Sequence, residues 1–285
     1  MSYVCVSLPC CSLDLVVNQT YLSTNSKNQC LLSYLKEVNV LMSQTIVIKI
    51  GGVASQQLSQ DFLNQVKTWK NEGHRLVIVH GGGYAINKLM KEQSIPVKKI
   101  NGLRVTSQSD MALVHHALVE QVGLDISKKL LKMDIDSIQL KASLARIVEA
   151  EFLDQETLGY VGKVCQIHPT FLDLVLEDDF VPILASLGYT KSGQELNINA
   201  DYLATAVASA LKADRLILMT DVPGVLENKQ VLDVLKVSDV QEKIDQEIIS
   251  GGMIPKIQAA VETVLAGVGQ VLIGDNLSTG TIIRE

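Results

Sequence analysis

The chain has 285 residues, of which 47% are hydrophobic and 20% are charged, and its formal net charge at pH 7 is −6. This length can bury a large core and hold one large domain or two lobes. The acidic balance and the lack of a basic stripe argue against a nucleic acid partner. No apolar run reaches the ~18–20 residues that a membrane-spanning helix needs.

The first 41 residues differ in composition from the rest of the chain. Four of the five cysteines lie there, at Cys5, Cys10, Cys11 and Cys30. A globular body with Cys165 as its one cysteine is typical of a reducing compartment, so we expect a cytoplasmic protein. No lysine or arginine precedes Lys27, which does not fit a secretory signal. We expect residues 1–41 to be an extension that is disordered or not native, with a short helix over Leu31–Met42 as the alternative.

From Thr45 onward, strand-like and helix-like segments alternate, which predicts an α/β fold. The expected strands are Thr45–Ile50, Arg75–Val79, Ser137–Leu140, Val181–Ser186, Arg215–Thr220 and a last strand at Gln270–Ile273. The expected helices are Ser59–Asn71, a segment carrying Ile86, Leu89 and Met90, then Ser109–Met133, Ala200–Lys212, Ser238–Ile249 and Ile254–Gly267. Two hairpins are expected, Pro96–Thr106 with its turn near Asn101-Gly102, and Ala145–Ile167, divided by Gly159 and Gly162. The nearly unbroken apolar strands predict a parallel or mixed sheet covered on both faces.

In such sheets ligands bind at the carboxyl ends of the strands, where the glycine runs of this sequence fall. The first run is Lys49-Ile50-Gly51-Gly52. It offers an ammonium group together with bare backbone N–H groups, which is what phosphoryl transfer requires. A surface lysine before a simple turn is the structural alternative, and no G-x-x-x-x-G-K-[ST] loop occurs.

The second run is His80-Gly81-Gly82-Gly83, between an expected strand and a helix. Its glycines let the backbone approach a ligand closely, and the N-terminus of the following helix favours an anion. A tight strand–helix turn is the structural alternative. We expect His80 to be packed or hydrogen-bonded rather than a catalytic base.

Two polar segments add side chains that suit a carboxylate or an amide. Asn101-Gly102-Leu103-Arg104-Val105-Thr106 puts the fork of Arg104 on a hairpin, and a solvated arginine is the alternative. Asn197-Ile198-Asn199-Ala200-Asp201 leads from a strand into a helix, with Asn197 and Asn199 on one side and an acid that can orient lysines. Helix capping is the alternative for this segment.

Two further segments suit a nucleotide. Thr220-Asp221-Val222-Pro223-Gly224-Val225 is an acidic turn after a strand, and it can accept hydrogen bonds from a ribose or a base. Gly251-Gly252-Met253-Ile254-Pro255-Lys256 begins a helix with a lysine nearby, which suits phosphates. A plain turn and a plain helix cap are the alternatives.

In this order, the six segments resemble the amino acid kinase family from about Thr45 to Thr281. The NGLRVT and NINAD segments are similar to those of members that phosphorylate N-acetyl-L-glutamate. The Lys-Gly-Gly and Thr-Asp-Val elements are shared more widely, for example with carbamate, aspartate and glutamate kinases. The resemblance implies a three-layer αβα sandwich with a central, mostly parallel sheet and two lobes. Residues 42–211 would form the acetylglutamate-binding lobe and residues 212–285 the ATP-binding lobe.

The resemblance also implies an activity and a role for each motif residue. The activity is ATP-dependent phosphorylation of the γ-carboxylate of N-acetyl-L-glutamate, the second step of arginine biosynthesis. Lys49 and Lys256 would stabilise the moving phosphoryl group, Lys256 would also pair the nucleotide phosphates, and Asp201 would orient both lysines. N–H groups of Gly52 and Gly82 would cradle the phosphoryl group. Gly82 and Gly83 would line the pocket for the acid, and Arg104 and Asn197 would hold its α-carboxylate. The residues that would bind ATP are Asp221, Val222, Pro223, Gly224, Val225, Leu226, Ser250 and Gly251.

The resemblance implies ATP with Mg²⁺ as the cofactor, the metal being held mainly by phosphates and water rather than by a protein site. It favours a homodimer over an arginine-inhibited hexameric ring, because residues 1–41 lack regular apolar spacing and the C-terminal segment Gly274–Glu285 is short. The rivals are a kinase for a related carboxylate, such as a carrier-bound aminoadipate derivative, and a silent member acting as a sensor. An NAD-binding protein is discounted, since no G-x-G-x-x-G follows a strand.

Overall fold

The computed structural model describes residues 3–6, 15–18, 43–51 and 58–285 of the chain. They fall in two compact units, Met1–Ser43 and Gln44–Glu285. In the first unit, β1 (Tyr3–Val6) pairs antiparallel with β2 (Leu15–Asn18). The short helix considered for Leu31–Met42 lies outside the described residues. That residues 1–41 are an extension that is disordered or not native stays a prediction. Among the described residues, every helix is too short or too polar to cross a bilayer.

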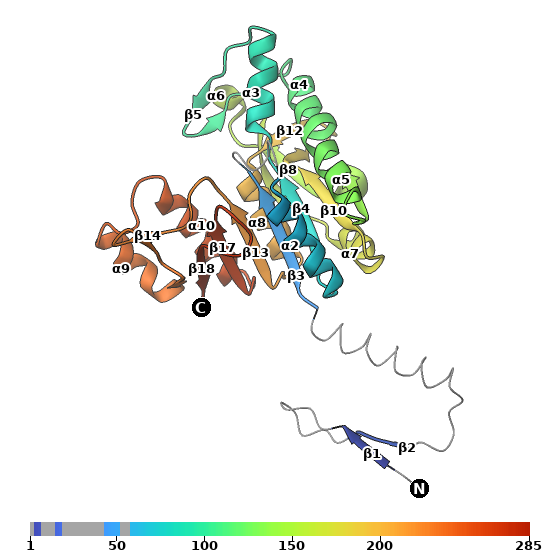
Figure 1. Cartoon of the computed structure of the whole chain (residues 1–285). Coiled ribbons are helices and arrows are strands. Elements are labelled where there is room, and N and C mark those ends of the chain that lie inside the picture. Colours follow the sequence, from blue (N-terminus) through green and yellow to red (C-terminus); the bar gives the residue numbers. More distant parts are fainter. Residues whose placement is uncertain (1–2, 7–14, 19–42, 52–57) are drawn as a thin grey trace. The chain divides into compact units, whose positions relative to one another are not determined.

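The second unit is built on one eight-stranded sheet (Figure 1). Its strands, in spatial order, are β7 (Ser137–Leu140), β10 (Val181–Ala185), β4 (Arg75–His80), β3 (Thr45–Ile50), β13 (Arg215–Met219), β17 (Gln270–Gly274), β18 (Thr281–Arg284) and β16 (Val234–Lys236). The strands from β7 to β17 are parallel, whereas β18 runs antiparallel to β17. The mostly parallel sheet expected from the apolar strands is confirmed.

The two faces of the sheet follow from the alternation of side chains along the central strands. In β3, Ile46, Ile48 and Ile50 join one buried cluster, while Val47 joins the other. Because successive side chains point to opposite faces, Lys49 lies on the same face as Val47. Every residue of β3 is buried, as a central strand covered on both sides requires.

Helices α2 (Gln60–Asn71) and α5 (Leu124–Leu131) contribute the side chains that cover the isoleucine face. Ser59 starts α2, since its hydroxyl accepts a hydrogen bond from the Phe62 N–H at 3.1 Å. The expected face of α2 is confirmed, because Phe62, Val66 and Trp69 are buried.

The opposite cluster is formed with α7 (Thr170–Glu177), α8 (Ala200–Ala210) and α10 (Met253–Leu265), so helices cover both faces of the sheet. Ala204 and Ala208 are fully buried, and these small side chains let α8 approach β3, β4 and β13 closely. The sequence analysis did not predict α7.

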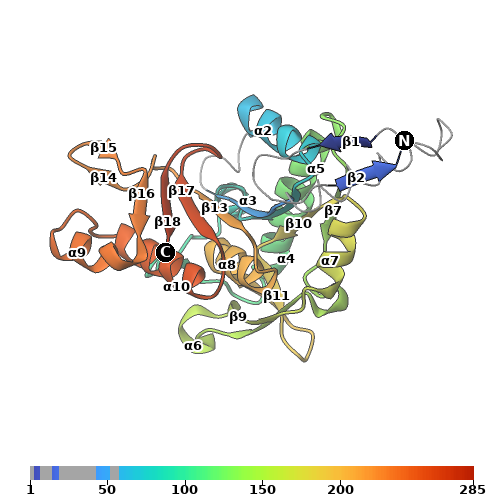
Figure 2. The ribbon, with the colours of Figure 1, turned by 90° about the horizontal axis from the view of Figure 1, so that it is seen from below.

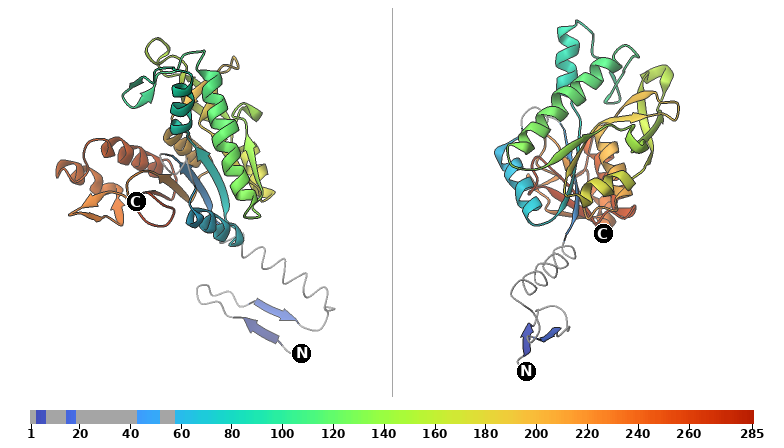
Figure 3. Two further views of the ribbon diagram at one scale, coloured as in Figure 1. Left: turned by 45° about the horizontal axis from the view of Figure 1, so that its top comes forward. Right: turned by 90° about the vertical axis from the view of Figure 1, so that its right-hand side faces the viewer.

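The long helix expected over Ser109–Met133 is present as one continuous rod (Figure 3). Its hydrogen-bond pattern changes in the middle. It consists of α4 (Met111–His115), the π-helical segment η2 (His116–Gly123) and α5. A π-helical turn shifts the side chains that follow it by one position and is frequent near functional sites. Here, η2 packs against α3 (Gly83–Glu92), which follows the glycine run.

A closed four-stranded barrel stands beside the sheet, formed by β8 (Val148–Phe152), β9 (Val161–Ile167), β11 (Leu187–Tyr189) and β12 (Glu195–Ile198). The antiparallel β8–β9 pair confirms the expected hairpin, with η3 (Leu144–Arg146) before it and α6 (Gln155–Leu158) within its connection. The division at Gly162 is wrong, because Gly162 lies inside β9. A Cβ atom there would come within 2.9 Å of the Leu196 side chain, so the tight barrel requires glycine.

Beyond β13, the chain adds small elements that gather beside β18 (Figure 2). They are the hairpin β14 (Leu226–Glu227) and β15 (Gln230–Val231), then η4 (Val237–Asp239) and α9 (Val240–Asp245). The prediction that Gln270–Ile273 is the last strand is wrong, because β18 follows it. Thr281 and Ile283 of β18 are buried, and this alternation fits a strand that packs on one face.

His80, at the end of β4, is the most deeply buried titratable side chain near the sheet edge. It is fully buried, its Nδ1 bonds the Gly81 carbonyl at 3.0 Å, and its Nε2 has no hydrogen-bond partner among the described residues. A carbonyl only accepts, so Nδ1 carries the proton of a neutral ring. Burial lowers the pKa of His80 to about 4, with the Gly81 hydrogen bond opposing the shift. The prediction of a packed, hydrogen-bonded His80 is confirmed.

His80 therefore predicts a pH-dependent stability. Its pKa is about 6.5 in the unfolded chain and about 4 in the folded one, so between these values the unfolded chain binds the proton more tightly. Stability is full above pH 6.5 and falls toward pH 4, by about 3 kcal/mol from this group. Denaturant titrations at several pH values between 4 and 7 give the free energy of unfolding at each pH. This free energy should change less steeply with pH for His80→Asn than for the wild type. The exposed His116 gives the control, His116→Asn, and equal slopes in all three proteins would contradict the assignment.

Candidate functional site

The carboxyl ends of β3, β4, β10 and β13 are tied together by backbone hydrogen bonds. The Gly81 N–H donates to the Ile50 carbonyl at 3.0 Å, and the Ser186 N–H donates to the His80 carbonyl at 3.0 Å. Beside this edge lies a cavity of about 220 Å³. It is lined by four groups of residues: Lys49 and Gly51; Gly81, Gly82, Gly83 and Ile86; Lys99, Gly102, Leu103 and Arg104; Val161, Ser186 and the run from Asn197 to Asp201.

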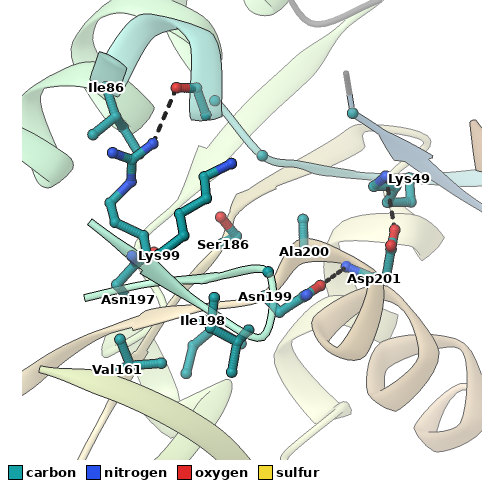
Figure 4. A pocket seen from close by; sticks show the side chains of 17 residues that line it. Lys49, Ile86, Lys99, Val161, Ser186, Asn197, Ile198, Asn199, Ala200 and Asp201 are labelled. Atoms are coloured by element: carbon teal, nitrogen blue, oxygen red, sulfur yellow. Dashed lines mark hydrogen bonds and ion pairs between the residues drawn. The ribbon is translucent and has the colours of Figure 1, made fainter. Parts of the chain in front are cut away.

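Lys49 sits at one end of this cavity and is 7% exposed. Its Nζ lies 2.7 Å from Asp201 Oδ1 and donates to the Met219 carbonyl at 3.1 Å (Figure 4). The Lys49 side chain folds back over Gly51, where any Cβ atom would collide with the ammonium group. The spacing Lys-x-Gly therefore leaves room for a buried cation. Gly52, the other glycine expected here, lies outside the described residues.

The Asn197–Asp201 segment serves both as a helix cap and as part of the site. Asn199 starts α8 by accepting a hydrogen bond from the Asp201 N–H at 2.8 Å, as Figure 4 shows. This start puts Asp201 in the first turn of α8, facing Lys49. Asn197, in β12, donates from Nδ2 to the Thr106 hydroxyl at 3.1 Å. The alternative of helix capping thus holds for Asn199, which also lines the cavity together with Asn197 and Asp201.

Arg104 sits at the other end of the cavity, on the hairpin formed by β5 (Lys99–Ile100) and β6 (Leu103–Arg104). Its Nη2 donates to the Gly83 carbonyl at 3.2 Å and to Asn87 Oδ1 at 2.5 Å. Burial lowers the pKa of Arg104 from its ordinary value, and Asp110 opposes this shift through space. The guanidinium is thus held in place by neutral oxygens of α3.

The glycine run after β4 presents backbone N–H groups to the cavity. Among the described residues, the N–H groups of Gly82 and Gly83 make no hydrogen bond. A trans peptide points its C=O and N–H in opposite directions, so the bond from His80 to the Gly81 carbonyl also fixes the direction of the Gly82 N–H. A Cβ atom at Gly82 would come within 2.7 Å of Leu118 Cδ2 in η2, which is why glycine stands there.

Lys256, in α10, donates to the Thr220 hydroxyl at 2.7 Å. Lys49 reaches the Met219 carbonyl, so the two lysines contact adjacent residues at the end of β13. The ion pair of Asp201 is with Lys49, and the orientation of Lys256 by Asp201 stays a prediction. The two catalytic lysines of the sequence analysis are nevertheless brought to the same strand end.

The residues predicted to bind ATP flank this strand end. Ser250 and Gly251 precede α10, and their carbonyls accept hydrogen bonds from the Met253 N–H at 3.2 Å and the Ile254 N–H at 3.3 Å. Asp221, Val222, Pro223 and Leu226 are exposed, while Gly224 and Val225 are buried. The Val225 N–H donates to the Thr281 hydroxyl at 2.8 Å, so β18 anchors the loop.

Three polar side chains of the site, those of Lys99, Ser186 and Asn87, escaped the sequence analysis. Lys99 and Ser186 line the cavity, and Asn87 holds Arg104 from α3. The two-residue turn at Asn101-Gly102 carries a signal for Lys99, because it puts positions 99 and 104 opposite each other. Within the described part of the chain, no group of three or more His, Cys, Asp or Glu side chains is arranged to hold a metal ion.

Comparisons with known proteins agree with this geometry. Residues 44–275 match the model of the amino acid kinase family. The chain is 61% identical over 242 residues to an acetylglutamate kinase from Streptococcus mutans, which covers 85% of this chain and 99% of that protein. It is 54% identical over 244 residues to an acetylglutamate kinase from Streptococcus sanguinis, with 86% and 100% covered.

Solved structures share the fold. A crystal structure from Streptococcus mutans UA159 superposes with a TM-score of 0.77 at 61% identity, over 84% of this chain and 98% of that one. Carbamate kinase from Giardia lamblia bound to AMP-PNP superposes with a TM-score of 0.63 at 16% identity, over 85% of this chain and 99% of that one. At this identity the likeness shows the fold alone. The three-layer αβα architecture predicted from the sequence is therefore that of these kinases. The chain belongs to the amino acid kinase family, among relatives that carry the name acetylglutamate kinase.

Proposed function

We propose that this chain transfers the γ-phosphoryl group of ATP to the γ-carboxylate of N-acetyl-L-glutamate, giving N-acetyl-L-glutamyl 5-phosphate and ADP in arginine biosynthesis. The observation that carries the proposal is one small cavity with a lysine–carboxylate pair at one end and Arg104 with Asn197 at the other. Such a cavity suits a short acid with a carboxylate at each end. The high identity to proteins named acetylglutamate kinase supports the same acceptor.

Arg104 and Asn197 bind the α-carboxylate in this proposal. A guanidinium fork and an amide N–H₂ group supply charge-assisted hydrogen bonds to a planar carboxylate. Arg104 is buried and held by Gly83 and Asn87, so little side-chain freedom is lost when the acid binds. The acceptor's γ-carboxylate then points toward Lys49, at the far end of the cavity.

Phosphoryl transfer proceeds by in-line attack of a γ-carboxylate oxygen on the γ-phosphorus of ATP. The new O–P bond forms as the bond to the β–γ bridging oxygen breaks, and ADP leaves with the electron pair. A carboxylate is ionised at neutral pH, so the reaction requires no general base. This agrees with a neutral, buried His80 that holds a peptide group rather than a proton of the substrate.

The chain contributes fixed positive charge and N–H groups aimed at the transferred group. Lys49 and Lys256 neutralise the charge on its oxygens, and the N–H groups of Gly82 and Gly52 cradle it. The Lys49 ammonium is held by Asp201 and the Gly82 peptide by His80, so little reorganisation of these two groups is needed in the transition state. Asp201 holds Lys49, and we propose that it orients Lys256 once ATP is bound.

ATP binds across the end of β13 in this proposal. The contributing residues are Asp221, Val222, Pro223, Gly224, Val225 and Leu226, with Ser250 and Gly251 before α10. Mg²⁺ enters with the nucleotide, held by phosphates and water, and neutralises phosphate charge. This suits a site edge that offers lysines and N–H groups to phosphates.

The proposal includes a division of labour and a setting. Residues 42–211 bind the acid and residues 212–285 bind ATP, which is supported by a cavity lined only by residues before position 212. We propose a homodimer that acts in the cytoplasm. The exposed free thiol of Cys165 is compatible with a reducing compartment.

A panel of acceptors tests the function directly. Hydroxamate trapping or a coupled ADP assay should show turnover with N-acetyl-L-glutamate well above that with L-glutamate, L-aspartate and carbamate. This result would show that turnover requires the acetyl group and both carboxylates of the acceptor. Equal rates across the panel, or no rate with N-acetyl-L-glutamate, would sink the assignment.

Replacing Lys49 tests the role of the buried ammonium group. Lys49→Met should lower kcat by about two to three orders of magnitude, because a fixed charge on the transferred phosphoryl group is lost. The KM for the acid should change little, and circular dichroism should show an intact fold. Lys88, exposed on α3 and outside the cavity, gives the control Lys88→Met. A variant at Lys49 with wild-type kcat would exclude this role.

Replacing Arg104 tests the recognition of the acid. Arg104→Ala should raise the KM for N-acetyl-L-glutamate by about 100-fold, the order expected when a buried charge pair loses one partner. The KM for ATP should stay within about twofold, since the hairpin lies away from the β13 end. Arg104→Lys should recover only part of the affinity, because an ammonium lacks the fork. An unchanged KM for the acid would show that Arg104 does not bind it.

A further inference from the structure

Lys99 and Arg104 stand directly opposite each other in the β5–β6 hairpin. The register pairs Lys99 with Arg104 and Ile100 with Leu103 across the Asn101-Gly102 turn. Both turn residues have positive φ angles, 50° and 81°, as a two-residue hairpin turn requires. Directly opposite side chains of an antiparallel pair project from the same face, and both of these cations line the cavity.

A like-charge pair in this position is destabilising unless an anion offsets it. Arg104 contacts neutral groups, the oxygens of Gly83 and Asn87 through Nη2 and the Met90 sulfur through Nη1. Asp110 acts on it through space but does not line the cavity. Among the described residues, no hydrogen bond or ion pair holds the Lys99 ammonium group. Figure 4 shows the Lys99 side chain extending into the cavity. The hairpin thus holds two positive charges without a carboxylate partner in the described structure.

The charge of the whole cavity leads to the same conclusion. Its lining includes three cationic side chains, Lys49, Lys99 and Arg104, and one carboxylate, Asp201. Asp201 pairs with Lys49, so the excess of two positive charges lies on the hairpin. An acceptor with a second carboxylate can place it between these two cations, whereas an acceptor with a single carboxylate, held at the Lys49 end, would leave both hairpin cations without an anion.

We propose that Lys99 determines specificity by binding, together with Arg104, the α-carboxylate of the acceptor, so that the cavity selects a dianionic acid. This inference rests on the proposed function and assigns to it a residue on the cavity's open side. Lys99 is exposed, so it acts on the bound acid and contributes nothing to the buried core.

The neighbouring lysine provides a matched control. Lys98 carries the same charge and is also exposed, but side chains alternate along a strand, and Lys98 does not line the cavity. Its backbone carbonyl accepts a hydrogen bond from the Val105 N–H at 3.0 Å, a bond that a side-chain change leaves intact. Lys98→Met therefore removes one lysine from the same hairpin without touching the proposed contact.

The experiment compares the full-length wild type, Lys99→Met, Lys99→Arg and Lys98→Met in steady-state kinetics at saturating Mg·ATP. Lys99→Met should raise the KM for N-acetyl-L-glutamate by about 10-fold, the order of one charge-assisted hydrogen bond, with kcat within about twofold. The KM of Lys99→Arg for N-acetyl-L-glutamate should lie between those of the wild type and Lys99→Met, and the KM of Lys98→Met should equal that of the wild type. Equal effects of Lys98→Met and Lys99→Met would overturn the proposal, because only general charge would then matter.

A second ligand identifies the carboxylate that Lys99 contacts. The α-carboxamide of N-acetyl-L-glutamate keeps the γ-carboxylate and is measured as a competitor of the diacid. Its inhibition constant should be the same for the wild type and Lys99→Met, since the proposed contact is already missing. A loss of affinity for both ligands, or a lowered kcat with unchanged KM, would move Lys99 to the γ-carboxylate or the phosphoryl group and overturn the assignment. A wild type that does not phosphorylate the diacid would instead refute the proposed function.

Discussion

The site depends on one ion pair, between the buried Lys49 at the end of β3 and the partly exposed Asp201 in the first turn of α8. Taking a lysine out of water is costly, and the nearby carboxylate and the Met219 carbonyl offset that cost. Two independent features create the pair. The alternation of β3 turns Lys49 to the face covered by α8, and the Asn199 cap sets where α8 begins. A shift of one residue in either would separate the charges.

The glycines of this site matter because they lack a side chain, as much as because of their conformational freedom. Gly51 leaves the volume that the Lys49 ammonium occupies, and Gly82 leaves the volume that Leu118 of η2 occupies. The π-helical segment therefore packs directly beneath the glycine run. With Gly82 pressed against η2 and its peptide held by His80, the N–H groups after β4 are fixed before any ligand arrives.

Much of the fold could be predicted from the sequence, because β3, β4, α2 and the Asn101-Gly102 hairpin have strong local signals. The elements that were missed or misjudged depend on distant partners. The apolar run of α7 fits a strand or a helix equally well until it packs on the sheet, and Gly162 reads as a break until β9 closes the barrel. The order of the motifs was enough to indicate where the site lies. Finding Lys99 required two further observations, the hairpin register and the cavity that the hairpin faces.

The arrangement separates the chemistry from the choice of substrate. In the proposed reaction, the lysines that contact the end of β13 supply charge to the transferred phosphoryl group, and any carboxylate acceptor would need that charge. The hairpin cations lie at the opposite end of the cavity, where they matter only to an acceptor with a second anionic group. Substrate identity then depends on a two-residue turn that sets which side chains stand opposite each other, because that register decides whether two positive charges or one face the acid.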